Sequence, residues 1–220
     1  MNYISKESKL SGEILIPASK SHTIRAVAMA AMAEGRSVLR NPLDSADARA
    51  AFRAAEEFGA RITEKEGSWI IDGVAGNISK VASFIDVANS GTTLRIFSAL
   101  AALNDQDITF DGDNSIRQRP MTSLISALRN LGVRIKSSED KCPLTIKGPI
   151  KGGSTTVDGI SSQFVTALLF STPLAVADSE IIVENLHEKP YVEITLDWLR
   201  SQNIQFEHLQ PLQIHQEAAE

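Results

Sequence analysis

The sequence predicts an α/β protein made of three βαβαββ repeats, with parallel apolar helices inside and four-stranded sheets outside. Three Ser-bearing turns, at residues 17–21, 87–91 and 159–163, each open an apolar helix. Each repeat also has a second helix, and the segments that end these helices recur at nearly the same spacing, at 58–62, 131–135 and 202–206. A period of about 70 residues, used three times, accounts for nearly the whole 220-residue chain.

We therefore expect a single domain over residues 1–220, an inside-out α/β prism whose repeats surround a pseudo-threefold axis. The repeats cover about 12–80, 83–150 and 153–216. In that arrangement the three buried helices run parallel, so that their first turns meet on one face.

The first repeat opens with an alternating strand at 12–16 and continues into a helix at 24–33. This helix is apolar on nearly every face apart from Arg25, and a helix that is apolar all round is a buried one. A strand at 37–40 follows, and 44–47 start an amphipathic helix with one side facing water.

The other two repeats contain the same kinds of element in the same order. The second repeat has a buried helix at 92–103, a strand at 107–110 and an amphipathic helix at about 120–131. In the third, we expect a buried helix opened by Ser162, a strand at 180–183, a helix from Pro190 to near 202 and a last strand at 209–215.

The composition excludes several classes of protein. A formal net charge of -5 argues against nucleic-acid binding, because such domains are strongly basic along one face. The start resembles no signal peptide, and no apolar run reaches the roughly 18 residues of a membrane span, so we expect a cytoplasmic protein without a membrane partner. Cys142 is the only cysteine and is assigned to packing, and the four histidines lack paired-ligand spacing, so no metal site is expected.

The starts of the buried helices are candidate anion sites. The unpaired N–H groups and the positive dipole end of a helix N-terminus attract phosphate or carboxylate. Lys20, Ser21 and Ser162 supply donors, Gly91 allows close approach to the backbone, and Arg25 can reach back to its own turn. The alternative interpretation is plain N-capping, for which Ser and Asn are favoured residues.

Three further arginines attract attention. Arg117 and Arg119 lie just before a helix start, where a cation is unfavourable unless an anion is also present, although a solvated charge pair is the simpler interpretation. Arg95 lies on an apolar helix, and for it we expect a buried ion pair within the domain. The sequence contains no nucleophile–base pair or Walker loop, so the site is rich in cations and poor in acid–base groups.

Five motifs at these positions occur together in one known family. They are Ser19-Lys20-Ser21-His22-Thr23-Ile24-Arg25, Asn89-Ser90-Gly91-Thr92-Thr93-Leu94-Arg95, Arg119-Pro120-Met121, Ser161-Ser162-Gln163-Phe164 and Lys189-Pro190-Tyr191. In this order and spacing the chain resembles, over roughly residues 10–207, the N-terminal half of the 5-enolpyruvylshikimate-3-phosphate (EPSP) synthases.

The resemblance implies a fold, a reaction and partners. Such enzymes have two domains of three βαβαββ units, with the active site between them. They transfer the enolpyruvyl group of phosphoenolpyruvate to the 5-hydroxyl of shikimate-3-phosphate, in the shikimate pathway of aromatic amino-acid biosynthesis, without a metal or organic cofactor. A complementary C-terminal domain carries the acidic residues for proton transfer, so we expect these 220 residues alone to be catalytically incomplete.

The resemblance also implies roles for nine residues. Lys20 would be the catalytic cation that contacts both substrates. Shikimate-3-phosphate would be held by Lys20, Ser21, Arg25, Ser161, Ser162, Gln163 and Tyr191. Phosphoenolpyruvate, and the herbicide glyphosate in its place, would meet Lys20, Gly91 and Arg119.

Two residues depart from the pattern, and two other functions stay open. Glu188 stands where many members have Ser before Lys-Pro-Tyr, and a carboxylate there would repel the substrate phosphate unless Lys189 compensates or Glu188 turns away. Ile96 replaces a frequent Pro, which puts inhibitor sensitivity in question. One alternative is a UDP-N-acetylglucosamine enolpyruvyl transferase, a branch that uses a cysteine in a loop and that Cys142, near a closing strand, matches poorly. The other is a non-catalytic interaction domain.

Overall fold

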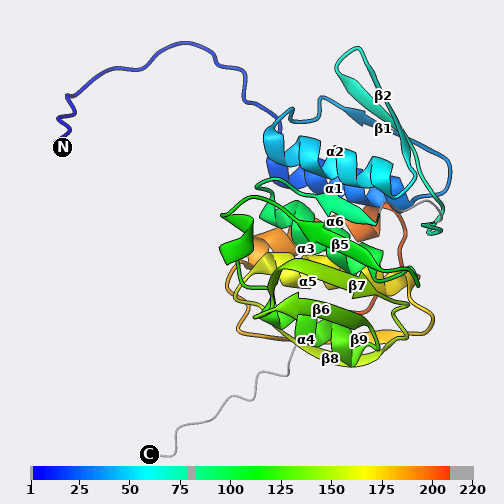
Figure 1. Cartoon of the computed structure of the whole chain (residues 1–220). Helices are drawn as coiled ribbons and strands as arrows, with labels where there is room; N and C mark the ends of the chain where they lie inside the picture. The colour runs from blue at the N-terminus through cyan, green and yellow to red at the C-terminus, as the bar shows by residue number, and fades with distance from the viewer. Residues whose placement is uncertain (1, 79–82, 209–220) are drawn as a thin grey trace, which may run out of the picture.

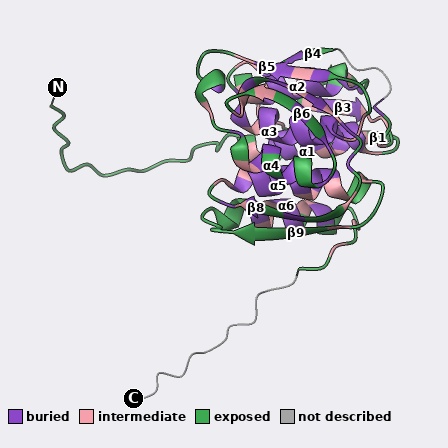
Figure 2. Ribbon diagram, turned by 60° about the horizontal axis from the view of Figure 1, so that its bottom comes forward, coloured by how far each residue is buried: buried purple, intermediate pink, exposed green. Residues whose placement is uncertain are grey.

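Three helices with buried sides form the interior of the molecule, and strands lie outside them (Figures 1 and 2). The computed structural model describes residues 2–78 and 83–208. The interior helices are α1 (Lys20–Met32), α3 (Gly91–Ala101) and α5 (Ser162–Ser171). The helices α2 (Ala46–Glu57), α4 (Thr122–Asn130) and α6 (Lys189–Ser201) each bury a narrower face, and short 3-10 turns lie at Ile116–Gln118 and Thr172–Leu174.

The described strands form three separate sheets. The first has the order β1-β3-β2, from β1 (Arg36–Arg40), β2 (Arg61–Lys65) and β3 (Ser68–Asp72). The second has the order β4-β5-β7-β6, from β4 (Phe84–Asp86), β5 (Ile108–Asp111), β6 (Arg134–Ser138) and β7 (Lys141–Lys147). In the third, β8 (Gly153–Asp158) pairs in parallel with β9 (Ser179–Glu184).

The expectation of a four-stranded sheet in every repeat is wrong for the described residues. Only the middle sheet has four strands within 2–78 and 83–208. The strand predicted at 12–16 does not form, because these residues run away from the body and have no neighbouring strand to accept their backbone hydrogen bonds (Figure 1). Leu15 in it is fully exposed. The strand predicted at 209–215 lies outside the described residues.

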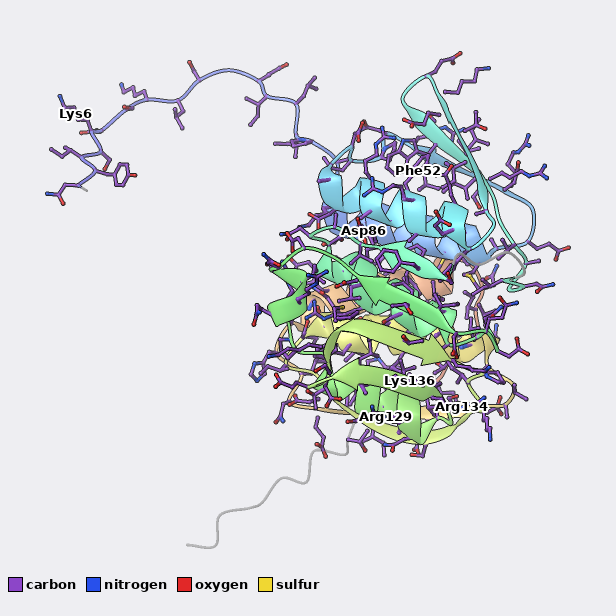
Figure 3. All side chains as sticks on the ribbon, viewed as in Figure 1. Lys6, Phe52, Asp86, Arg129, Arg134 and Lys136 are labelled. Atoms are coloured by element: carbon purple, nitrogen blue, oxygen red, sulfur yellow. The ribbon has the colours of Figure 1, made fainter. Side chains whose placement is uncertain are left out.

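The exposed edge of the middle sheet carries positive charge. Strand β6 is its last strand, and Arg134 and Lys136 on that strand are exposed. Figure 3 shows both side chains extending from the ribbon, with Arg129 of α4 nearby in the view.

The three interior helices run in the same direction. Near their starts, Arg95 of α3 donates to Gln163 of α5, and Arg25 of α1 donates to Thr166 of α5. At their other ends, residues of all three helices line one shallow apolar groove, among them Met32, Leu100 and Phe170. Starts therefore meet starts, and ends meet ends.

A serine opens each interior helix, as the helix N-terminus requires. Ser19, Ser90 and Ser161 are the N-caps of α1, α3 and α5, and each hydroxyl accepts an N–H from the first turn. Helix α1 begins at Lys20, four residues before the expected start, so the polar turn itself is helical. Cys142 is buried in the core as predicted.

The three outer helices end in the same way. After each C-cap comes a residue with positive φ, Gly59, Gly132 or Asn203. The residue after that donates its N–H five residues back, to Ala55, Leu128 or Leu199. This is the Schellman closure, which places glycine or asparagine in the left-handed region. Within the described residues, no helix is long and apolar enough to cross a membrane.

We predict that Gly59→Ala lowers the free energy of unfolding by about 1–2 kcal/mol, because alanine is strained at a φ of 100°. Asn203→Gly is the matched control at the equivalent place and should cause no such loss, since glycine adopts this conformation freely. Urea unfolding followed by circular dichroism measures both. Equal stability of Gly59→Ala and the parent chain would contradict the assignment.

Candidate functional site

The start of α1 is tied to α2 and α3 through Asp47. Lys20 Nζ lies 3.4 Å from Asp47 Oδ2, and the backbone carbonyl of Asp47 accepts from Thr93 Oγ1 at 3.3 Å. The Lys20 side chain remains half exposed. A lysine at the first turn of a helix is thus held in place by a carboxylate while part of its surface stays open to solvent.

Arg25 lies at the centre of a polar cluster beneath this surface. It is only 2% exposed. Its guanidinium donates to Thr195 Oγ1 at 2.9 Å, to Thr166 Oγ1 at 3.0 Å, and to the carbonyls of Tyr191 and Ser21 at 3.1 and 3.2 Å. Burial lowers the pKa of Arg25 to about 10. The prediction that Arg25 reaches back to its own turn is confirmed by the bond to Ser21.

Gly91 opens α3 between two guanidinium groups. A Cβ built on Gly91 would meet Arg119 Nη1 at 2.5 Å and Arg95 Nη1 at 2.7 Å. Arg119 is held by a 3.0 Å bond to the side-chain oxygen of Asn89, whose amide in turn donates to Asp113 at 2.6 Å. The absence of a side chain at Gly91 therefore leaves two cations directly above a helix N-terminus.

Arg95 does not form the ion pair expected for it. Its described partners are neutral oxygens: Gln163 Oε1 at 2.8 Å and the carbonyls of Gly91 and Pro120 at 3.3 and 3.4 Å. Its guanidinium also lies over the Phe164 ring, 5.0 Å from the centroid. Burial and then the charge of Arg119 lower the pKa of Arg95 to about 10. Neutral acceptors and an aromatic face take the place of a carboxylate here.

The start of α5 already holds a carboxylate. Glu188 Oε2 accepts from the backbone N–H of Ser162 at 3.1 Å and from its hydroxyl at 2.8 Å. Ser162 is buried, Ser161 and Gln163 are partly exposed, and the Tyr191 side chain lies at the surface with 45% of the residue exposed. Of the two possibilities raised for Glu188, turning away is wrong, because the side chain faces the helix start.

Arg117 belongs to a different group of contacts. It pairs with Asp111 at 2.8 Å, and this contact lowers the pKa of the Asp111 carboxyl. The two arginines before α4 therefore differ: Arg117 has a carboxylate partner, whereas the described partner of Arg119 is Asn89. The solvated interpretation holds for Arg117, whose side chain is half exposed, whereas Arg119 is only partly exposed and is bound to Asn89.

The structure brings most of the candidate residues together through these bonds. One set joins Lys20, Asp47 and Thr93, a second joins Gly91, Arg95, Arg119 and Gln163, and a third joins Ser21, Arg25, Thr166, Tyr191 and Thr195. N-capping and a cationic surface, the two interpretations of the helix starts, therefore occur together. The serines cap the helices, and lysine and arginine side chains lie around those caps.

Three members of the site were missed by sequence reasoning. Asp47 holds Lys20, Asn89 holds Arg119, and Arg95 holds Gln163. Asn89 stands inside a motif already noticed, so the signal was present there. Arg95 ends the same motif, but it was expected to form an ion pair inside the domain, and Asp47 gave only the signal of a helix start.

The chemistry of the site is that of anion binding. Arg25 and Arg95 are buried and contact no carboxylate within the described part of the chain, where Arg95 Nε is a buried donor without a partner. Buried guanidinium groups held by neutral oxygens keep an unneutralised positive field, which favours phosphate and carboxylate groups.

Comparison with known proteins identifies one family. Residues 4–217 match the sequence profile of EPSP synthase (3-phosphoshikimate 1-carboxyvinyltransferase). The 3-phosphoshikimate 1-carboxyvinyltransferase of Acetivibrio thermocellus is 42% identical over 205 residues, which are 92% of this chain and 48% of that protein. The enzyme of the same name from Methanothrix thermoacetophila is 45% identical over 197 residues, 88% of this chain and 46% of that protein.

A solved structure agrees with these relatives. The EPSP synthase of Acinetobacter baumannii superposes with a TM-score of 0.79 at 25% identity, over 90% of this chain and 45% of that one. The chain spans about half the length of the curated relatives it matches. By sequence profile, curated relatives and fold, the chain belongs to the EPSP synthase family.

Proposed function

We propose that this chain is the shikimate-3-phosphate-binding half of an EPSP synthase. The complete enzyme transfers the enolpyruvyl group of phosphoenolpyruvate to the 5-hydroxyl of shikimate-3-phosphate and releases phosphate. The observation that supports this most directly is the pair of buried guanidinium groups, Arg25 and Arg95, held by neutral oxygens at the starts of three helices. Both substrates are phosphate and carboxylate anions, and such a surface attracts them.

The roles follow from position. Arg25, with Ser21, holds the ring carboxylate of shikimate-3-phosphate, and Ser161, Ser162, Gln163 and Tyr191 hold its ring and phosphate. Gly91 and Arg119 bind the phosphate of phosphoenolpyruvate, because the missing side chain at Gly91 leaves the Arg95 and Arg119 guanidinium groups close to the backbone at the start of α3. Lys20, half exposed beside Asp47, contacts both substrates and stabilises charge that develops between them.

The domain arrangement is part of the proposal. Residues 1–220 form one cytoplasmic domain of three related units around a pseudo-threefold axis, an inside-out prism whose repeated helix closures support the symmetry. A complementary C-terminal half supplies the groups for proton transfer, because the carboxylates of the site among the described residues, Asp47 and Glu188, are already bound to Lys20 and Ser162.

The UDP-sugar alternative is disfavoured by Cys142. That cysteine lies on strand β7 with 6% exposure, and burial raises its pKa to about 12. A buried thiol of that pKa is a poor nucleophile or acid in a substrate loop. The alternative of a non-catalytic domain is supported by one contact, the carboxylate of Glu188 on Ser162.

Trp198 provides a direct test of binding. Its indole Nε1 donates to His22 Nδ1 at 3.2 Å, beside the start of α1, whereas the other tryptophan, Trp69, is buried on β3. In a Trp69→Phe background we expect shikimate to change the Trp198 fluorescence saturably. The same chain should turn over phosphoenolpyruvate only after the C-terminal half of a 3-phosphoshikimate 1-carboxyvinyltransferase is added. A flat titration would refute ligand binding.

We predict that Gly91→Ala raises the KM for phosphoenolpyruvate about tenfold in the complemented enzyme, because the added Cβ enters the gap between Arg95 and Arg119. The melting temperature should change little, since the better helix propensity of alanine, about 1 kcal/mol, offsets the displacement of the Arg95 and Arg119 side-chain ends that the Cβ requires. Steady-state kinetics and thermal unfolding together separate a filled anion site from a damaged helix. An unchanged KM would remove Gly91 from the binding site.

We predict that Lys20→Met lowers kcat/KM of the complemented enzyme by at least about 100-fold, because a preorganised charge at the reacting groups is lost. Lys6→Met is the matched control, on the segment that runs away from the body (Figure 3). It should leave the rate unchanged. Similar rates for both variants would show that Lys20 has no part in turnover.

A further inference from the structure

Glu188 makes a contact that its own position in the chain does not require. It is the residue immediately before α6, yet its side chain caps no N–H of that helix. Within the described residues, both hydrogen bonds of its side chain go through Oε2 to Ser162, at the start of α5. The carboxylate therefore serves a helix start 26 residues away along the chain.

The two donors on Ser162 are the ones that an anion at this helix start would need. The residue is 2% exposed, and its N–H and its hydroxyl are both bound to the same carboxylate oxygen. A phosphate oxygen bound to Ser162 would have to share both donors with the Glu188 carboxylate, and the two negative groups would repel each other at contact distance. Phosphate and the Glu188 carboxylate are therefore mutually exclusive ligands of Ser162.

A buried cation lies next to this helix start, although Asp158 also places a carboxylate near it by accepting from the N–H of Ile160 at 3.0 Å. Arg95, only 7% exposed, bonds to Gln163 next to Ser162, and its Nε is a buried donor without a partner in the described part of the chain. The charge of Glu188 opposes the lowering of the Arg95 pKa, which burial and Arg119 cause. Glu188 thus neutralises part of a cationic site as long as no other anion is present.

The carboxylate can leave without unfolding the domain. Glu188 is exposed, and it lies between β9 and α6 rather than inside either element. Within the described residues it has no Lys or Arg partner within 4.0 Å. Rotating it outward exposes the charge to water and frees both donors of Ser162.

We propose that Glu188 is a specificity-determining residue, an internal anion that occupies the phosphate subsite at the start of α5 and competes with the phosphate of the substrate. This inference rests on the proposed function for the identity of the ring ligand. It deepens that function by adding that the Glu188 carboxylate competes with the ligand phosphate for this subsite. A phosphorylated ring ligand must displace Glu188, whereas a ligand with only the ring carboxylate, held near Arg25, does not.

Inorganic phosphate tests the subsite without any ring ligand. The Ser162 amide resonance in the ¹⁵N-labelled chain is the reporter, for the parent chain, Glu188→Ser and Glu188→Gln. We expect Glu188→Ser to respond to phosphate at concentrations lower by about tenfold or more, since a charged competitor with two hydrogen bonds is gone. Glu188→Gln keeps an oxygen acceptor for Ser162 and should show a smaller gain without loss of the cap.

Glu193→Gln is the matched control, because it removes the same charge from the next turn of α6, where Glu193 lies 4.0 Å from Arg200. It should respond as the parent chain does. Equal responses of the parent chain and Glu188→Ser, or no response in either, would overturn the proposal. If Glu193→Gln responds to phosphate at concentrations as low as Glu188→Ser does, the effect comes from the net charge of the protein alone. That result would also overturn the proposal.

The ring ligands then separate this inference from the proposed function. Trp198 fluorescence in the Trp69→Phe background should show shikimate binding equally to the parent chain and to Glu188→Ser. Shikimate-3-phosphate should bind Glu188→Ser about tenfold or more tightly than the parent chain. A parent chain that prefers the phosphorylated ligand as strongly as Glu188→Ser does refutes the role of Glu188. If shikimate binds to neither, the proposed function fails, and the phosphate titration still decides about Glu188.

Discussion

The burial of Arg25 without a carboxylate is the constraint on which much of the arrangement depends. A buried guanidinium must have its donors satisfied, and Arg25 obtains its acceptors from α1, α5 and α6 at once. Those acceptors are available only if the helix starts lie on the same side of the molecule. The same contacts leave the positive charge unneutralised, so one side chain both aligns the helices and prepares the surface for an anion.

The sequence predicted the elements with local causes. Serine caps, apolar helices and the residues that close the outer helices are encoded within a few positions, so α1, α3 and α5 were recognisable, and so were the turns at Gly59, Gly132 and Asn203. The assignment of Cys142 to the core followed from its single occurrence and is confirmed by its burial.

Features that depend on residues far away in the sequence could not be predicted from local sequence patterns. The alternation at 12–16 states only that a strand can form, and no pairing partner is present in the described structure. Arg95 was expected to need a carboxylate, but Gln163, 68 residues away, and the Phe164 ring satisfy it instead. The sequence showed that Glu188 was unusual, whereas only the fold shows that it faces Ser162.

The positive edge of the middle sheet has a consequence for the behaviour of the protein in concentrated solution. Strand β6 ends that sheet with backbone groups that could pair with another molecule, and such edges are starting points for aggregation. Arg134 and Lys136 place cations on that strand, so two copies brought edge to edge repel each other. The charges on this strand thereby oppose extension of the sheet into fibrils from its β6 edge.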